Sequence, residues 1–139
     1  MADFNKCIKD TLTNEGYFNG KAGFVNDIDD AGGLTIAGIA SKFHPTWEGF
    51  TRAKQLGYDA KKMTNDPILY NMITKFYKSE FWDKIGGDNI KPQNIASILM
   101  DAAVLEGIVP AIKRAQLIVG SQQTGKVNQE LIDKLSVLQ

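Results

Sequence analysis

The chain has 139 residues, of which 43% are hydrophobic and 23% charged, a composition that excludes disorder and allows one domain with a buried core. Sixteen basic and sixteen acidic residues cancel, so no net positive field draws the chain to nucleic acid or to an anionic membrane. The single cysteine, Cys7, excludes an internal disulfide. The N-terminus lacks a signal-peptide pattern, and no run of about eighteen apolar residues could span a membrane.

The first predicted helix covers residues 2–14 and places Glu15 at its C-terminal end. Its apolar residues recur every four positions, the spacing of one helix face: Phe4, Ile8 and Leu12. Gly16 can end the helix. The helix dipole disfavours a carboxylate at this end, which would help to raise the pKa of Glu15. The position is unusual for a structural glutamate and suits a catalytic acid.

Residues 16–35 are predicted to form a loop or a small hairpin, with short strands near 24–28 and 34–36. The segment is rich in glycine and crowds three acids, Asp27, Asp29 and Asp30. Carboxylates gathered beside a helix-borne glutamate are the groups that glycoside hydrolysis uses. The alternatives are aspartates that shape a turn or bind calcium. Gly32 and Gly33 allow a positive φ or a close approach to a ligand.

The rest of the chain is predicted to be helical, with helices over 35–43, 47–56, 67–77 and 92–107, another from after Pro110 to Gly120, and a last short helix that Asn128 caps. The strongest signal belongs to the helix that begins at Pro67, where Thr64, Asn65 or Asp66 can serve as the N-cap. The fold class is therefore mainly α, with at most a small sheet near the front.

Other chemistries have little support in the residues. His44 is the single histidine, and without a histidine–cysteine cluster we expect no zinc site, no other metal and no cofactor. Several aromatic side chains could stack on sugar rings. Of these, we expect Tyr17, Trp47 and Tyr77 to lie near a cleft.

Three segments near the front resemble glycoside hydrolase family 108, whose members are phage and bacterial N-acetylmuramidases: Glu15-Gly16-Tyr17, Phe24-Val25-Asn26-Asp27, and Asp30-Ala31-Gly32-Gly33-Leu34-Thr35-Ile36-Ala37-Gly38-Ile39. Later segments are similar to the peptidoglycan-binding part that accompanies the family: Phe81-Trp82-Asp83-Lys84-Ile85, Asp101 to Gly107, Ala115-Gln116 and Gly125. The chain departs from the family pattern in an insertion, Phe18 to Gly23, and at Ile28, Leu34 and Leu105.

The resemblance implies a lysozyme-like, mainly helical single domain over residues 1–139, with a catalytic part at 1–85 and a helical peptidoglycan-binding-like part at 86–139. It implies that Glu15 is the general acid and that Asp30 and Thr35 hold the attacking water, although Asp27 and Asp29 stay candidates for the assisting carboxylate. The residues expected to bind substrate are Tyr17, Asn26, Asp27, Gly32, Gly33 and Tyr77.

The expected activity is cleavage of the β-1,4 bond between N-acetylmuramic acid and N-acetylglucosamine, in a phage endolysin or a secretion-associated muramidase. Inverting and retaining mechanisms both stay open. The alternatives are a non-catalytic peptidoglycan-binding or secretion-assisting module and a lytic transglycosylase. The expected partners are peptidoglycan glycan strands and a holin or export system. We expect a monomer that stays in the bacterial cytoplasm until it is released or exported to the cell wall.

Overall fold

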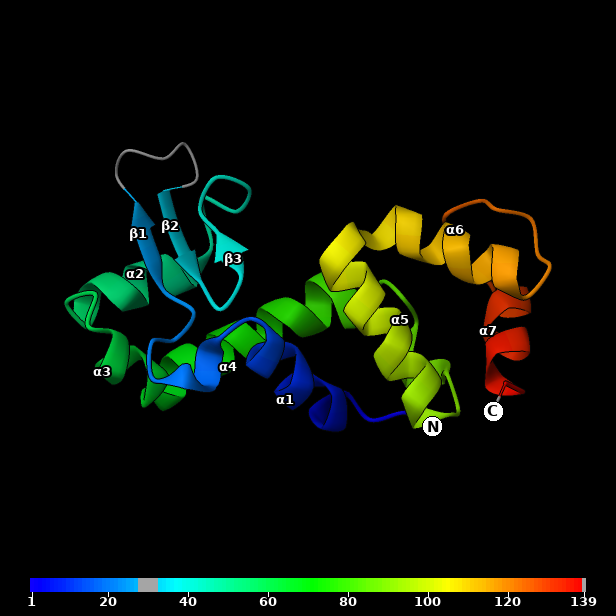
Figure 1. Ribbon diagram of the computed structural model, residues 1–139, viewed down its shortest axis with the longest axis horizontal. Coiled ribbons are helices and arrows are strands. Elements are labelled where there is room, and N and C mark those ends of the chain that lie inside the picture. The colour runs from blue at the N-terminus through cyan, green and yellow to red at the C-terminus, as the bar shows by residue number, and fades with distance from the viewer. Residues whose placement is uncertain (28–32, 139) are drawn as a thin grey trace. The chain divides into compact units, whose positions relative to one another are not determined.

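The computed structural model describes residues 1–27 and 33–138, which form helices and one small antiparallel sheet (Figure 1). The N-terminal elements are α1 (Phe4–Asn14), the 3-10 turn η1 (Tyr17–Asn19), β1 (Val25–Asp27), β2 (Gly33–Ile36) and β3 (Ile39–Ala40). There follow α2 (Glu48–Gln55), α3 (Ala60–Thr64), α4 (Pro67–Tyr77), the π-turn η2 (Lys78–Trp82), η3 (Gly87–Asn89), α5 (Gln93–Glu106), α6 (Ile108–Ile118) and α7 (Gln129–Ser136). The predicted fold class, mainly α with a small hairpin near the N-terminus, is confirmed.

Contacts divide the chain into two compact units, one of residues 9–75 and one that joins residues 1–8 to residues 76–139. The first unit holds the sheet, and the second holds α5, α6 and α7. The division follows Lys75, whereas we expected a catalytic part that extends to residue 85. That functional boundary stays a prediction. Within the described part of the chain, every helix is too short or too polar to cross a membrane.

The sheet has the order β1-β2-β3, and all its pairs are antiparallel. The β1–β2 hairpin confirms the two predicted strands. The helix predicted over 35–43 is wrong, because β2 continues to Ile36 and turns directly into β3. Ala37 and Gly38 have φ values of +49° and +83°, the left-handed pair that a two-residue hairpin turn requires. No helix can pass through such a turn.

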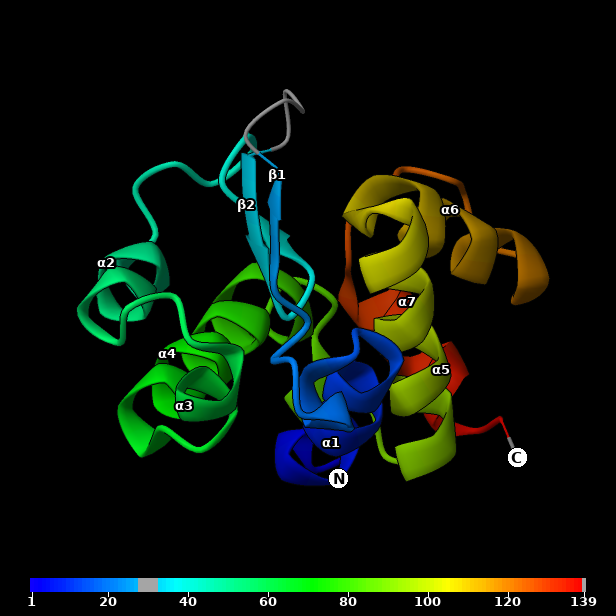
Figure 2. The ribbon, with the colours of Figure 1, turned by 60° about the vertical axis from the view of Figure 1, so that its left-hand side comes forward.

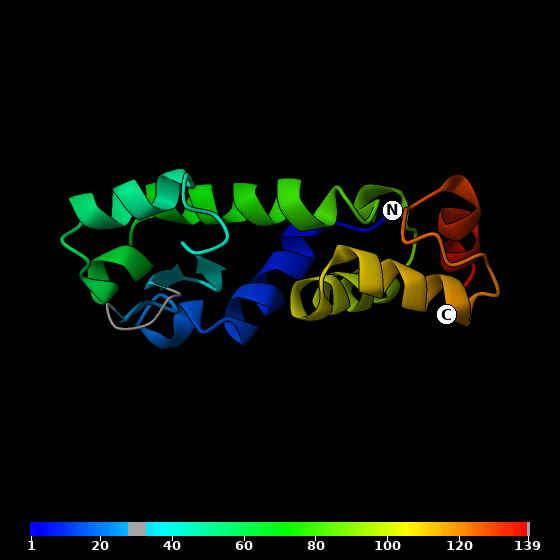
Figure 3. The same ribbon diagram turned by 90° about the horizontal axis from the view of Figure 1, so that it is seen from above.

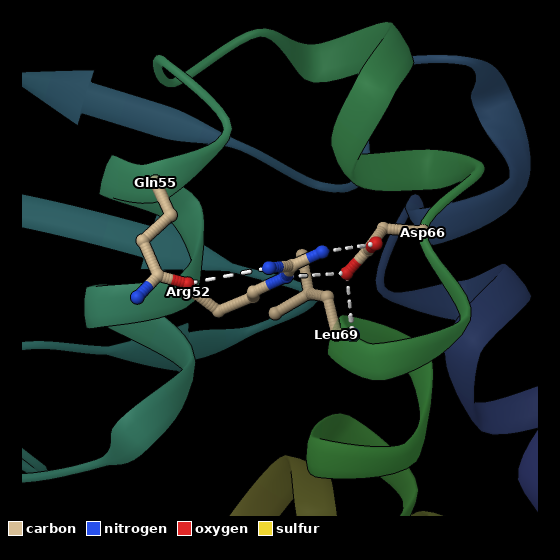
Figure 4. A network of polar contacts seen from close by, with 4 residues as sticks. All are labelled: Arg52, Gln55, Asp66 and Leu69. Atoms are coloured by element: carbon tan, nitrogen blue, oxygen red, sulfur yellow. Dashed lines mark hydrogen bonds and ion pairs between the residues drawn. The ribbon is translucent and has the colours of Figure 1, made fainter.

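A two-point ion pair in the first unit joins α2 to the start of α4 (Figure 4). The Arg52 guanidinium donates to both carboxylate oxygens of Asp66, at 2.9 and 2.7 Å. The same carboxylate accepts from the Leu69 N–H at 2.8 Å, so Asp66 is the N-cap of α4 among the three predicted candidates. The hydrogen bonds from Arg52 hold the pKa of Asp66 below its usual value.

In the second unit α5 packs against α6 (Figure 2), and α7 lies by the C-terminal end of α6 (Figure 3). α6 begins at Ile108 rather than after Pro110. Proline is tolerated there because the first N–H groups of a helix have no partner within it. As predicted, Asn128 caps α7 and accepts from the Leu131 N–H at 2.9 Å.

The fully buried side chain of Gln116 organises the loop between α6 and α7. Its amide nitrogen donates to the Thr124 hydroxyl at 3.0 Å and to the Lys126 carbonyl at 3.1 Å. Its amide oxygen accepts from the Gly125 N–H at 3.0 Å. A buried amide is costly unless it is hydrogen-bonded, and these three bonds meet that requirement within the loop itself.

Candidate active site

Glu15 lies directly after the last residue of α1, as the sequence predicts. Its N–H donates to the Thr11 carbonyl at 3.0 Å, so the helical turn that ends at Glu15 is still closed. Gly16 then adopts a φ of +77° and ends the helix. The Glu15 side chain is only partly exposed, and burial raises the pKa of its carboxyl. A carboxyl in this state keeps its proton to a higher pH than an exposed one, which is the property of a general acid.

The backbone of Glu15 is fixed where the turn before β1, at Gly23, lies close to the turn between β2 and β3, at Ala37. The Gly23 N–H donates to the Gly16 carbonyl at 3.0 Å, and the Ala37 N–H donates to the Ala22 carbonyl at 2.9 Å. A Cβ added to Gly23 would lie 2.5 Å from the Glu15 carbonyl oxygen and 3.0 Å from the backbone nitrogen of Ala37. Gly23 thus occupies a space too small for any side chain. The β2–β3 turn is thereby connected to the end of α1.

Thr35 lies in the central strand of the sheet, opposite Val25 of β1 and Ala40 of β3. Its neighbour Ile36 is fully buried, and successive strand residues point to opposite faces. Thr35 therefore projects from the other face, where Val25 is 55% exposed. The Thr35 hydroxyl thus belongs to the open face of the sheet, in the same unit as Glu15.

The remaining loop residues divide into described and undescribed ones. Asn26 is exposed on β1, and Asp27 pairs with Gly33 at the end of the hairpin. Gly33 has a φ of +61°, and a Cβ there would lie 2.9 Å from the Ser41 hydroxyl. This agrees with the left-handed backbone that we predicted for Gly33. The predictions for Asp29, Asp30 and Gly32 fall outside the described residues.

Tyr17 and Tyr77 are core residues, so the prediction that they line a cleft is corrected. They are 1% and 2% exposed and present no ring face on which a sugar could stack. The Tyr17 hydroxyl donates to the Thr64 carbonyl at 3.2 Å, and burial, helped by Tyr70 and Asp66, raises its pKa to about 12. Tyr77 stacks on Phe81 with ring centroids 5.7 Å apart. Both rings stabilise packing.

Two positioning features escaped the sequence analysis. One is the Ala37-Gly38 turn, for which the signal was the two-residue separation of Ile36 from Ile39. The other is Ser41, whose hydroxyl accepts from the Leu34 N–H at 3.0 Å while its own N–H donates to the Leu34 carbonyl at 2.8 Å. These bonds fix β2 near Gly33, and they thereby help to fix the neighbouring Thr35.

Among the side chains that the structure describes, those of residues 1–26 and 33–138, no group of three or more from His, Cys, Asp or Glu lies close enough together to hold a metal ion. The described candidates are thus a partly buried acid and a strand hydroxyl. Together they offer proton donation to a bond and hydrogen bonding to water or sugar.

Comparison with known proteins gives a family and a fold. The model of the family described as glycosyl hydrolase 108 matches residues 8–107. The solved structure of Brucella abortus SagA is similar over 98% of this chain and 70% of that one, with a TM-score of 0.62 and 22% sequence identity. At this identity the likeness shows a shared fold. A search of curated proteins finds no match.

Proposed function

The chain belongs to glycosyl hydrolase family 108, and from that premise we propose that it cuts the β-1,4 bond between N-acetylmuramic acid and N-acetylglucosamine, with Glu15 as the general acid. Family membership makes the chain a glycosidase and a peptidoglycan hydrolase of the muramidase type. The bond that it cuts and the roles of its residues are the proposal.

The observation that carries the proposal is the state of Glu15, a partly buried acid with a raised pKa and a fixed backbone. In the proposed step the Glu15 carboxyl gives its proton to the glycosidic oxygen as the bond from that oxygen to the anomeric carbon breaks. The bonding electron pair leaves with the oxygen, and positive charge develops on the sugar ring. A general acid contributes about 10²- to 10⁴-fold to such a reaction.

The attacking water needs a second group, for which we propose Asp30 together with Thr35. The Thr35 hydroxyl projects from the open face of the sheet, where it can accept from a water or donate to one. We propose that Asn26, which is exposed on β1, and Asp27 hydrogen-bond to the sugar. The backbone at Gly32 and Gly33 would let the glycan approach closely.

The decisive experiment is digestion of purified peptidoglycan by the wild type and by Glu15→Gln, with the soluble products identified by mass spectrometry. Glu48→Gln is the matched control, because Glu48 is an exposed glutamate in the same unit. The proposal expects hydrated N-acetylmuramic acid at the reducing ends from the wild type and the control, and at least 10²-fold less product from Glu15→Gln.

Other outcomes assign the chain differently. Anhydro-muramic ends would make it a lytic transglycosylase. An inactive wild type that still pellets with the cell wall would make it a peptidoglycan-binding module. The same pelleting assay on Glu15→Gln measures how well the whole chain binds the wall, since the glycan is not cut during the measurement. We propose that residues 86–139 contribute to this binding.

The assisting groups are tested separately by Asp30→Asn and Thr35→Val, with Asp27→Asn and Asp29→Asn in parallel. We expect Asp30→Asn to reduce turnover more than either of the other aspartate variants. A larger loss in Asp27→Asn or Asp29→Asn would transfer the assisting role to that residue. Thr35→Val keeps the shape of a strand residue and removes the hydroxyl, so its loss of activity measures the hydroxyl alone.

A further inference from the structure

Thr11 carries a buried hydroxyl that the fold leaves without a hydrogen bond. The residue lies on α1 and is 2% exposed, and its Oγ1 has no hydrogen-bond partner among the described residues. Buried hydroxyls in folded proteins nearly always have a partner, so this one requires an explanation. A helical threonine can bond the carbonyl four residues earlier, as Thr13 does with Lys9 at 2.8 Å. Thr11 does not.

Glu15 follows Thr11 by one helical turn. The Glu15 N–H donates to the Thr11 carbonyl, so the two residues have the i, i+4 relation, in which Cβ atoms lie about 5–6 Å apart. Helical side chains lean toward the N-terminus, which directs the Glu15 side chain back over Thr11. The two groups are not hydrogen-bonded in this structure, so the contact requires a rotation of the Glu15 side chain or one bridging water.

We propose that Thr11 is a positioning residue for Glu15, with its buried hydroxyl hydrogen-bonded to the Glu15 carboxyl at the moment of proton transfer. The inference rests on the proposed role of Glu15 as the general acid. A hydroxyl offers one donor and two lone pairs and can rotate. It donates to the carboxyl oxygen that carries no proton, while the other oxygen passes its proton to the glycosidic oxygen, and it keeps this bond to the carboxylate that results.

The bond contributes more after proton transfer than before it. A hydrogen bond to a carboxylate is roughly twice as strong as one to a neutral group. Thr11 therefore stabilises the charge that develops on Glu15, which favours the transition state over the ground state. Burial raises the pKa of Glu15, and no charged side chain among the described residues contributes to that shift. The proposed bond from the Thr11 hydroxyl would offset part of that rise.

The test removes the hydroxyl and keeps the shape. Thr11→Val is nearly isosteric, Thr11→Ser restores a hydroxyl, and Thr13→Val is the matched control on the exposed face of the same helix. With soluble peptidoglycan fragments we expect Thr11→Val to lower kcat about tenfold with little change in KM. The limb of the kcat/KM profile that reports loss of the Glu15 proton should move to higher pH. Thr11→Ser should recover most of kcat, and Thr13→Val should match the wild type.

A second measurement does not depend on turnover. NMR titration of the Glu15 side-chain carboxyl should give a higher pKa in Thr11→Val than in the wild type or in Thr13→Val. Thr11→Ala repeats the comparison if the valine variant does not fold. An unchanged pKa together with an unchanged pH profile would overturn the role of Thr11 while leaving the muramidase proposal intact. A wild type without activity would instead overturn the proposed function, and the titration would still decide the Thr11–Glu15 contact.

Discussion

Replacing Gly23 with alanine tests whether the close contact between the Gly23 turn and the β2–β3 turn fixes the backbone of Glu15. Gly20 lies in the same loop and provides the control, because both glycines have a positive φ, +57° at Gly23 and +82° at Gly20. A Cβ on Gly20 would have no neighbour within 4 Å, whereas one on Gly23 would meet the Glu15 carbonyl oxygen at 2.5 Å. The two substitutions thus share the conformational cost and differ in the steric one.

The difference between the two variants can be estimated. A left-handed alanine costs about 1–2 kcal/mol, partly offset by about 0.4–1 kcal/mol because the unfolded chain is less flexible. Gly20→Ala should therefore lose about 1 kcal/mol. Gly23→Ala adds about 1–3 kcal/mol of overpacking and about 1 kcal/mol if the hydrogen bond from Ala37 to Ala22 breaks. The atoms in contact with the new Cβ belong to the backbone, so no side chain can rotate away.

Thermal unfolding followed by circular dichroism measures this difference. For a chain of this length 1 kcal/mol corresponds to about 3–5 °C, so Gly23→Ala should melt about 10 °C below Gly20→Ala. Peptidoglycan digestion below both melting temperatures should show a further loss in Gly23→Ala, because a displacement of about 1 Å can cost roughly 10²-fold. Melting temperatures within about 2 °C of each other would refute the steric reasoning.

Three further predictions concern ionisable groups. Glu15→Gln should melt above the wild type at pH 7 and at the same temperature as the wild type near pH 3. The raised pKa means that ionised Glu15 opposes folding once the pH exceeds the unfolded value of 4.5. An equal difference in melting temperature at both pH values would contradict this. Asp66→Asn can still cap α4 but should melt at a lower temperature than the wild type at pH 7. This difference in melting temperature should vanish as the pH falls through the lowered pKa of Asp66, because the ion pair with Arg52 is then lost in both proteins. Tyr17→Phe should lower the free energy of unfolding by about 1 kcal/mol, because the hydrogen bond to Thr64 is lost. In an ultraviolet titration the variant should lack the tyrosine ionisation at about pH 12. If that ionisation persists, it belongs to another tyrosine.

Features with local causes could be predicted from the sequence. Asn128 caps α7 because its side chain reaches an N–H three residues ahead, and Gly16 ends α1 because glycine tolerates a positive φ. The sequence around residues 35–43 misled us for the opposite reason. Ala37 is buried and left-handed, a conformation that the pairing of β2 with β3 through a two-residue turn requires and that alanine alone would not choose.

The candidate site was predictable to a similar extent. Glu15 could be singled out as a candidate acid because its charge conflicts with its place at a helix end, and its catalytic role stays a prediction. Tyr77 continues the apolar stripe of α4 at four residues from Ile73, so its burial could have been read from the spacing. Thr11 could not have been found, because a threonine on an apolar helix face has no chemical signal until the structure leaves its hydroxyl without a partner.

The bonds of Gln116 bear on the order in which the chain folds. All three partners lie eight to ten residues ahead of it, and closing so short a loop loses little chain entropy. The segment from α6 to α7 can therefore acquire its buried amide bonds early, before contacts between residues far apart in the sequence have formed. Because the Gly125 N–H is buried and hydrogen-bonded, it should exchange with solvent in the folded protein as slowly as the amides of a helix interior, although it lies in a loop.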